Sequence, residues 1–186
     1  GPTHQPVEHE LQVRLMEALK NHKGKNSMLV LRPADVDETT VAWKMALENQ
    51  DTPTALILSR QNVKNLPRKE SKYNEALGAT KGAYIVKDCE GTADVILLAS
   101  GSEVSTLVAA TELLESRANL NVRIVSVPSE GLFFSQPESY IRSVIDYNLP
   151  IFGLTAGLPL SMQRLVGLKG KVFGLDHFGD SAPYTV

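Results

Sequence analysis

The sequence predicts an α/β fold built as three-layer α/β/α sandwiches with mostly parallel sheets. Short hydrophobic runs of strand length alternate along the chain with longer stretches that repeat apolar residues at helical spacing. The 186 residues are 42% hydrophobic and 22% charged, which is typical of a globular chain and argues against disorder. This length suits one large domain or two small ones.

The first predicted helix covers residues 7–22. Four apolar residues recur in it at helical spacing, and Gly24 follows as a stop signal. They are Leu11, Leu15, Ala18 and Leu19.

A strand–helix–strand unit follows. Residues 27–31 form a predicted strand, and Asp35 with Glu38 makes a capping-box pattern before a helix over residues 36–48. The inward stripe of this helix is predicted to be Val36, Thr40, Trp43 and Leu47. Residues 54–58 form the second strand, so the two strands should be parallel, with a right-handed crossover.

The periodic pattern stops between residues 61 and 82, where charged residues crowd around Pro67. Because a structureless connection of about 20 residues is uncommon inside a compact domain, we interpret this stretch as a linker. We place one domain at residues 1–66, the linker at 67–82 and a second domain at 83–186. The chain lacks a starting Met and a closing helix, so we expect a fragment that is cut at both ends.

The second domain repeats the alternation of strands and helices. Its predicted strands are residues 84–87, 94–100, 122–127, 150–155 and 171–175. Helical stretches follow Gly101-Ser102-Glu103 and Pro137, and a third lies within residues 158–166. The helix after Gly101 carries Val104, Leu107, Val108 and Leu114 on one face.

The charge and the composition exclude several classes of function. A net charge of −2 argues against a nucleic-acid surface, for which a basic stripe is expected. No apolar run approaches the roughly 18 residues of a membrane span, and no secretory signal is visible. Cys89 is the only cysteine, so an intrachain disulfide is excluded and a cytoplasmic location is expected.

His4 stands between Pro2 and Pro6, which fix the backbone and remove amide donors, so it should lie on a stiff, extended segment. A histidine titrates near neutrality and can transfer protons or bond to a sugar hydroxyl. An ordinary surface histidine is the alternative, and the chemistry alone does not decide between the two.

Arg60 follows the second predicted strand, and ligands of parallel α/β sheets lie outside the carboxyl ends of strands. Its planar guanidinium suits a phosphate group, although an arginine without a ligand is the commoner case at a strand end. Gly101-Ser102-Glu103 could hold an anion but is more typical of a plain turn. Asp176 and His177 lack a second histidine at ligand spacing, and Cys89 lacks the features of a nucleophile.

Taken together, six blocks of sequence resemble the transketolase family, in the family's order. They are Gly1–Glu8 (GPTHQPVE), Arg32–Asp35 (RPAD), Pro53–Asn62 (PTALILSRQN), Gly101–Val104 (GSEV), Ser126–Ser129 (SVPS) and Phe178–Pro183 (FGDSAP). The resemblance runs over nearly the whole chain but covers only the C-terminal part of the enzyme. Residues 9–28 form a longer segment than the family pattern has, and Thr155 replaces a common glutamate.

The resemblance implies the end of a pyrimidine-binding domain, followed by a C-terminal domain with a mixed five-stranded sheet whose first strand is antiparallel. It implies transfer of a two-carbon ketol unit between sugar phosphates in the pentose phosphate pathway, by a homodimer that uses thiamine diphosphate and a divalent metal, Mg or Ca. His4 then matches a catalytic residue that faces substrate hydroxyls, and Arg60 matches the arginine that grips the phosphate.

The resemblance also implies what this chain lacks. The glutamate that activates the cofactor and the diphosphate and metal ligands belong to parts of the enzyme before Gly1, so we expect no cofactor-binding or metal-binding residue here and no activity from the chain alone. Two alternatives stay open: a non-catalytic dimerisation or regulatory module, and another thiamine-diphosphate enzyme such as a deoxyxylulose-phosphate synthase.

Overall fold

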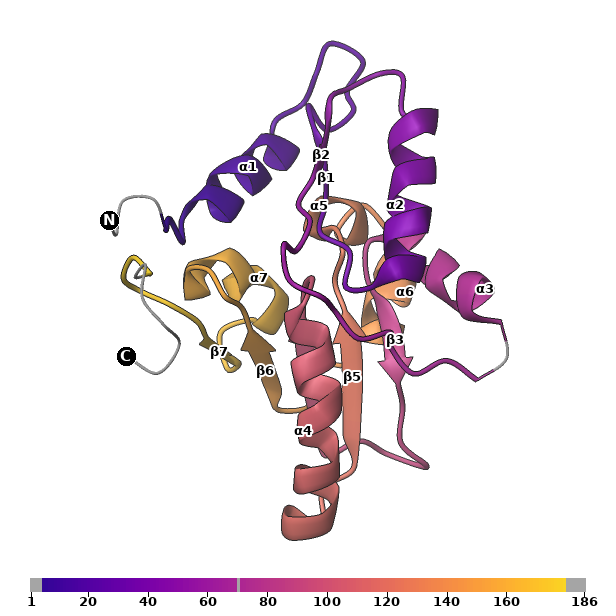
Figure 1. Ribbon diagram of the computed structural model, residues 1–186, viewed down its shortest axis with the longest axis vertical. Coiled ribbons are helices and arrows are strands. Elements are labelled where there is room, and N and C mark those ends of the chain that lie inside the picture. The colour runs from indigo at the N-terminus through magenta and orange to yellow at the C-terminus, as the bar shows by residue number, and fades with distance from the viewer. Residues whose placement is uncertain (1–4, 70, 180–186) are drawn as a thin grey trace.

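The computed structural model describes residues 5–69 and 71–179 (Figure 1). In this range the chain forms a two-stranded sheet and a five-stranded sheet, with helices on both faces of the larger one. The predicted α/β fold is confirmed. The described residues include no helix that is long and apolar enough to cross a membrane.

The smaller sheet is a parallel strand–helix–strand unit, as predicted. Its elements are β1 (Leu29–Leu31), α2 (Val36–Glu48) and β2 (Thr54–Leu56). The bounds of α2 agree with the prediction because the Asp35 carboxylate caps the helix by accepting the N–H of Glu38. The Glu38 carboxylate in turn accepts the N–H of Ala34, the residue before the N-cap, whereas a capping box would use the N–H of Asp35 itself.

The larger sheet has the strand order β3-β5-β4-β6-β7, and β3 is antiparallel to its neighbour β5 while the other pairs are parallel. The strands are β3 (Tyr84–Lys87), β4 (Val95–Ala99), β5 (Val122–Ser126), β6 (Ile151–Leu154) and β7 (Lys171–Phe173). The expected mixed sheet with an antiparallel first strand is therefore confirmed.

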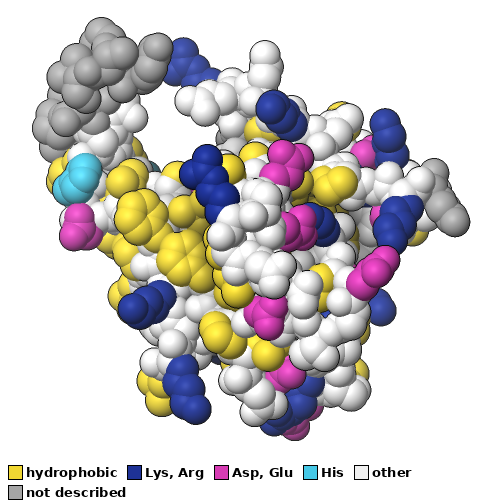
Figure 2. Space-filling model, turned by 90° about the horizontal axis from the view of Figure 1, so that it is seen from below, with side chains coloured by type: hydrophobic (Ala, Val, Ile, Leu, Met, Phe, Trp, Pro, Cys, Tyr) yellow, Lys and Arg dark blue, Asp and Glu magenta, His cyan; other side chains and the backbone are white. Residues whose placement is uncertain are grey.

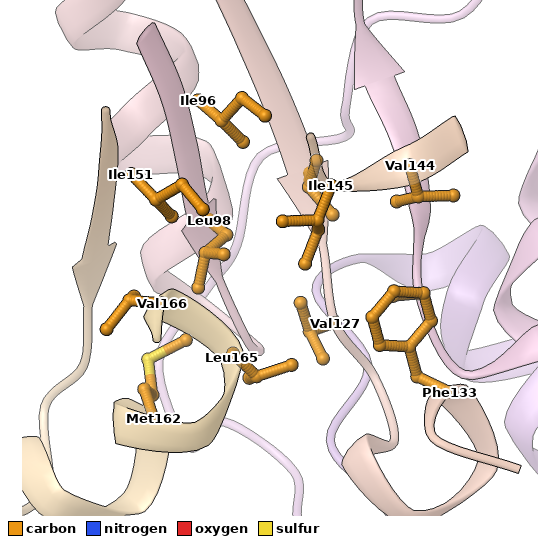
Figure 3. Close-up of a cluster of buried hydrophobic side chains, with 12 residues drawn as sticks. Ile96, Leu98, Val127, Phe133, Val144, Ile145, Ile151, Met162, Leu165 and Val166 are labelled. Atoms are coloured by element: carbon orange, nitrogen blue, oxygen red, sulfur yellow. The ribbon is translucent and has the colours of Figure 1, made fainter. Parts of the chain in front are cut away.

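Both faces of the larger sheet are buried. One face packs on α4 (Glu103–Ala118), and the other packs on α5 (Glu130–Phe133), α6 (Glu138–Val144), the 3-10 turn η3 (Pro159–Met162) and α7 (Gln163–Val166). In β4, Ile96 and Leu98 join the cluster around Phe133 (Figure 3), while Leu97 and Ala99 pack under α4. Alternate side chains of one strand thus reach opposite cores.

The inward stripe predicted for the second helix is wrong, and the predicted first helix is shorter than expected and buries charged rather than apolar side chains. In α1 (His9–Ala18), Leu15 is 56% exposed, and the buried side chains are the charged Arg14 and Glu17. In α2 the predicted stripe points outward, with Val36 56% and Leu47 77% exposed. Trp43 is 51% exposed too, whereas Glu38, Val41 and Ala42 are buried.

The stretch between residues 61 and 82 is not structureless. It contains α3 (Lys72–Ala76) and the 3-10 helix η2 (Leu77–Lys81), both of which pack against α2. Leu66 is buried, and so is the side chain of Arg68. The domain boundaries themselves stay a prediction.

The surface shows mixed charge. In the view of Figure 2, basic and acidic side chains are interspersed, and hydrophobic side chains gather on the left of the face. This face carries no basic stripe of the kind that nucleic acids require.

The orientation of α2 can be tested with one substitution made on each side of it. Val41→Ala should lower the free energy of unfolding by about 2 kcal/mol, because Val41 is buried. Val36→Ala should change it by less than about 0.5 kcal/mol, because Val36 is exposed. Urea denaturation of both variants measures this, and equal losses would contradict the orientation described above.

Candidate functional site

Arg60 lies in the connection that leaves the carboxyl end of β2, and it is exposed. The connection begins where the Ile57 N–H donates to the Leu31 carbonyl at 2.8 Å, next to the end of β1. The Ser59 hydroxyl accepts the Gln61 N–H at 3.2 Å and so closes a tight turn around Arg60. Arg60 thus stands at the edge of the sheet where α/β proteins bind ligands.

His4 lies outside the described residues, but the chain that follows it is attached to loops of the larger sheet. The Gln5 carbonyl accepts the N–H of Gly179 at 3.1 Å, and the Val7 carbonyl accepts the N–H of Leu158 at 3.1 Å. Both donors follow strands of the larger sheet, β7 and β6. Residues 5–7 are therefore held at the carboxyl edge of that sheet.

Arg32 crosses from the end of β1 to the end of β4. Its Nη1 donates to the Ser100 carbonyl at 2.5 Å, and its Nη2 donates to Glu103 Oε1 at 3.0 Å. The same Glu103 oxygen accepts the N–H of Ala156 at 2.9 Å. Gly101 has φ +67°, and a Cβ there would lie 2.8 Å from Arg32 Nε, so a larger residue would displace the guanidinium.

This arginine occupies the topological switch point of the larger sheet. The strands β4 and β6 are neighbours, and the connections that follow them leave toward opposite faces of the sheet. Ligands of open α/β sheets bind in the crevice between two such strands. The Gly101-Ser102-Glu103 turn therefore faces an arginine of its own chain. Ser102 precedes α4 without capping it, because its hydroxyl bonds to Glu103 Oε2 at 3.3 Å.

The charged face of α1 contacts the same edge of the larger sheet, next to Arg32. The Arg14 guanidinium donates to Ser100 Oγ and to Glu10 Oε1, both at 3.0 Å. One turn further on, the Glu17 carboxylate accepts the Ser129 hydroxyl at 2.9 Å. Burial raises the pKa of Glu17, although the nearby Arg14 opposes that change. The charges explain why the apolar face of α1 points outward.

A second buried network surrounds Asp35. Its carboxylate accepts the N–H of Glu38 and the N–H of Leu66, each at 2.9 Å, and pairs with the Arg68 guanidinium through both oxygens. Arg68 also donates to the Tyr84 hydroxyl at 3.1 Å, and that hydroxyl donates to Glu38 Oε1 at 2.8 Å. The network therefore joins the start of α2, the segment of residues 66–68 and strand β3 of the larger sheet.

The two carboxyl groups of this network shift in opposite directions. Burial opposes ionisation of Asp35, but the hydrogen bonds from Arg68 and from two N–H groups outweigh it and hold its pKa below the ordinary value. Burial raises the pKa of Glu38, whose side chain is fully buried. Its donors, the Ala34 N–H and the Tyr84 hydroxyl, are neutral.

The remaining candidates show no site chemistry. Asp176 and His177 are exposed after β7, and Cys89 is a half-buried free thiol. Within residues 5–69 and 71–179, no group of three His, Cys, Asp or Glu side chains could hold a metal ion.

Sequence reasoning missed the importance of Arg32 and Arg68. Arg32 entered it only within the RPAD block, and Arg68 only among the charges around Pro67. The position of Arg32 directly after a strand, the same signal that selected Arg60, could have found it. The partner of Arg68 lies 33 residues away, and no local signal marks it.

Two family models together account for most of the chain. Residues 1–65 match the transketolase pyrimidine-binding domain, and residues 82–186 match the transketolase-like C-terminal domain. The fold and these matches define an α/β protein that joins part of a pyrimidine-binding domain to a C-terminal domain.

Individual relatives agree with this class. The chain is 42% identical over 98% of its length to the transketolase of Halalkalibacterium halodurans and 44% identical over 98% to that of Staphylococcus aureus. A transketolase structure from Leishmania mexicana superimposes with a TM-score of 0.82, at 37% identity over 98% of this chain and 24% of that one. The chain belongs to the transketolase family. It spans about a quarter of the length of the two curated relatives, 26% of each.

The Asp35 network predicts a dependence of stability on pH. Asp35→Asn should lower the free energy of unfolding at pH 7 by about 3 kcal/mol, because it removes the fully buried charge that pairs with the buried Arg68 guanidinium. Ionised Asp35 stabilises the fold above its ordinary pKa of 3.8, and this contribution is lost as the pH falls through the lower folded value. The difference between wild type and variant should therefore shrink as the pH falls below 3.8.

Urea denaturation at pH 7 and at low pH measures this difference. Asp88→Asn is the matched control, because Asp88 pairs with Arg123 in a similar two-pronged way but is exposed, so its effect should stay below about 1 kcal/mol. A pH-independent difference for Asp35→Asn would contradict the prediction.

Proposed function

We propose that this chain acts as the C-terminal part of a transketolase, which moves a two-carbon ketol unit from a ketose phosphate to an aldose phosphate. The observation that carries the proposal is the 42% identity to a transketolase over 98% of the chain. Structures of a Pichia stipitis transketolase, 33% and 32% identical to this chain, are described as complexes with xylulose 5-phosphate and sedoheptulose 7-phosphate. Sugar phosphates of this kind are the proposed substrates.

Arg60 and His4 are the proposed substrate-binding residues, and His4 also has the catalytic role. Arg60 suits the phosphate because its exposed guanidinium can form two parallel hydrogen bonds to the oxygens. His4 suits proton transfer at the sugar hydroxyls because an imidazole changes charge near neutral pH. The attachment of residues 5–7 to the larger sheet supports a defined position for the chain next to His4.

The match to a pyrimidine-binding domain implies thiamine diphosphate, which when bound supplies the carbon nucleophile of the reaction. The divalent metal, Mg or Ca, belongs to the same proposal. The described residues offer no metal-binding cluster, so we derive no step through either group. The proposal includes a cytoplasmic homodimer that works in the pentose phosphate pathway, and the domain division at residues 1–66, 67–82 and 83–186.

A non-catalytic assembly unit is the second candidate function. The exposed apolar residues of α2, Val36, Trp43 and Leu47, favour contact with another protein surface. A split-gene transketolase described as an inactive beta4 tetramer superimposes with a TM-score of 0.67, but at 19% identity this likeness shows the fold alone.

The chain by itself should show no ketol transfer, because the family resemblance assigns the cofactor-activating glutamate and the diphosphate and metal ligands to other parts of the enzyme. An assay of the purified chain with thiamine diphosphate, a divalent metal and two sugar phosphates measures this. Turnover above the protein-free background would overturn the proposed division of the site.

In the full-length transketolase proposed here, Arg60→Ala should raise KM about tenfold to a hundredfold for phosphorylated ketoses, through loss of charge-assisted hydrogen bonds. KM for unphosphorylated ketoses should stay nearly unchanged. Steady-state kinetics with both kinds of ketose measure this, and an equal rise in both KM values would refute the role of Arg60.

His4→Ala in the same enzyme should lower kcat and leave the affinity for thiamine diphosphate unchanged. Steady-state kinetics and cofactor titration measure these two quantities, and a collapse of cofactor binding would refute the role of His4.

A further inference from the structure

We propose that Asp35 and Arg68 are positioning residues for phosphate recognition, because together they hold the loop that carries Arg60. This loop, residues 57–66, is called the Arg60 loop below. The inference rests on the proposed function of Arg60 and goes beyond it, since neither Asp35 nor Arg68 need touch the substrate.

Both ends of the Arg60 loop are attached to the same short segment of chain. At its start, the Ile57 N–H donates to the Leu31 carbonyl at 2.8 Å. At its end, the Leu66 N–H donates to Asp35 Oδ2 at 2.9 Å. Leu31 is the last residue of β1 and Asp35 is the residue before α2, so the short segment 31–35 fixes where the loop begins and where it ends.

The first attachment continues the backbone pairing of β2 with β1, whereas the second depends on one side chain. Asp35 must therefore keep its carboxylate turned toward Leu66. Arg68 enforces this orientation by bonding to both carboxylate oxygens from a side chain that is itself only 2% exposed. Rotation of Asp35 would break the two-pronged pairing with a buried guanidinium and leave only the single contact with Asp37, which is strongly unfavourable.

Arg68 is itself held on further sides. It donates to the Tyr84 hydroxyl on β3 at 3.1 Å and to Asp37 Oδ2 on α2 at 3.2 Å. The guanidinium is thus a rigid support and not a mobile surface charge. Arg68 lies two residues beyond the end of the loop, so it supports Asp35 next to the point where Leu66 closes the loop.

Release of the loop end should act on substrate affinity in a selective way. The turn formed by Ser59 and Gln61 is local and survives, so Arg60 keeps its own backbone geometry. What is lost is the placement of that turn relative to the sheet, which must be restored whenever a phosphate binds. The cost falls on phosphorylated sugars only, because an unphosphorylated sugar makes no use of Arg60.

The experiment compares three variants of the full-length enzyme in parallel: Arg60→Ala, Arg68→Ala and Arg123→Ala. Arg68→Ala should raise KM for a ketose phosphate about tenfold and change KM for an unphosphorylated ketose less than about twofold. Arg123→Ala is the matched control, because Arg123 forms a two-pronged pair with Asp88 near the start of β5, whereas Tyr84, the partner of Arg68, lies beside the end of β5. It should show no such split.

The outcomes separate the two proposals. If Arg60→Ala shows the split and Arg68→Ala does not, the positioning role is wrong and the function of Arg60 stands. If Arg60→Ala shows no split, the proposed function fails, and this inference fails with it. If Arg68→Ala fails to fold, Arg68→Lys, which keeps the charge but loses the two-pronged pairing, must show a smaller split of the same kind; its absence overturns the proposal.

Hydrogen exchange on this chain gives a readout that does not depend on activity. In Arg68→Lys the Leu66 amide should exchange at least about tenfold faster, while the Ile57 amide, which pairs with Leu31, keeps its protection. Unchanged exchange at Leu66, or an equal increase at both amides, contradicts a specific role in closing the loop.

Discussion

The Asp35 carboxylate is fully buried and accepts hydrogen bonds from two backbone N–H groups and from two nitrogens of Arg68. Burying both ions costs several kcal/mol, which these hydrogen bonds and the charge pairing offset, so the pair adds little net stability. What it provides is a unique arrangement, because α2, the end of the Arg60 loop and the segment that leads to β3 all meet at one carboxylate. The position of each depends on the other two.

Polar side chains also connect α1 and the end of β1 with the larger sheet. At the carboxyl edge of this sheet, Arg32 donates hydrogen bonds to the Ser100 carbonyl and to Glu103. Arg14 donates to the Ser100 hydroxyl, and Glu17 accepts the Ser129 hydroxyl. The switch point that other α/β proteins use for ligands is thereby filled by an internal arginine. This occupation is consistent with the proposal that places the substrate-binding residues, His4 and Arg60, in the first part of the chain.

Local sequence signals predicted α2 and the strands well, because a cap such as Asp35 and a run such as residues 95–99 act within a few residues. They failed for the inward face of α2, and they did not show that α1 buries charged side chains. Apolar spacing identifies a stripe but not its partner, and α1 packs against a polar joint through Arg14 and Glu17. Of the candidate site, Arg60 could be predicted from its place after a strand, whereas Arg68 is defined by a contact 33 residues away.

The opposite pKa shifts of Asp35 and Glu38 show where the charge of this network resides. The two acids are three residues apart and both are buried, but only Asp35 faces a guanidinium. Arg68 therefore keeps Asp35 ionised, while Glu38, with neutral donors alone, has its pKa raised. A hydrogen bond to an ionised acceptor is roughly twice as strong as a neutral one. The N–H of Leu66 donates to the ionised acid and not to its neighbour, so the arginine that closes the Arg60 loop also determines how firmly the loop is closed.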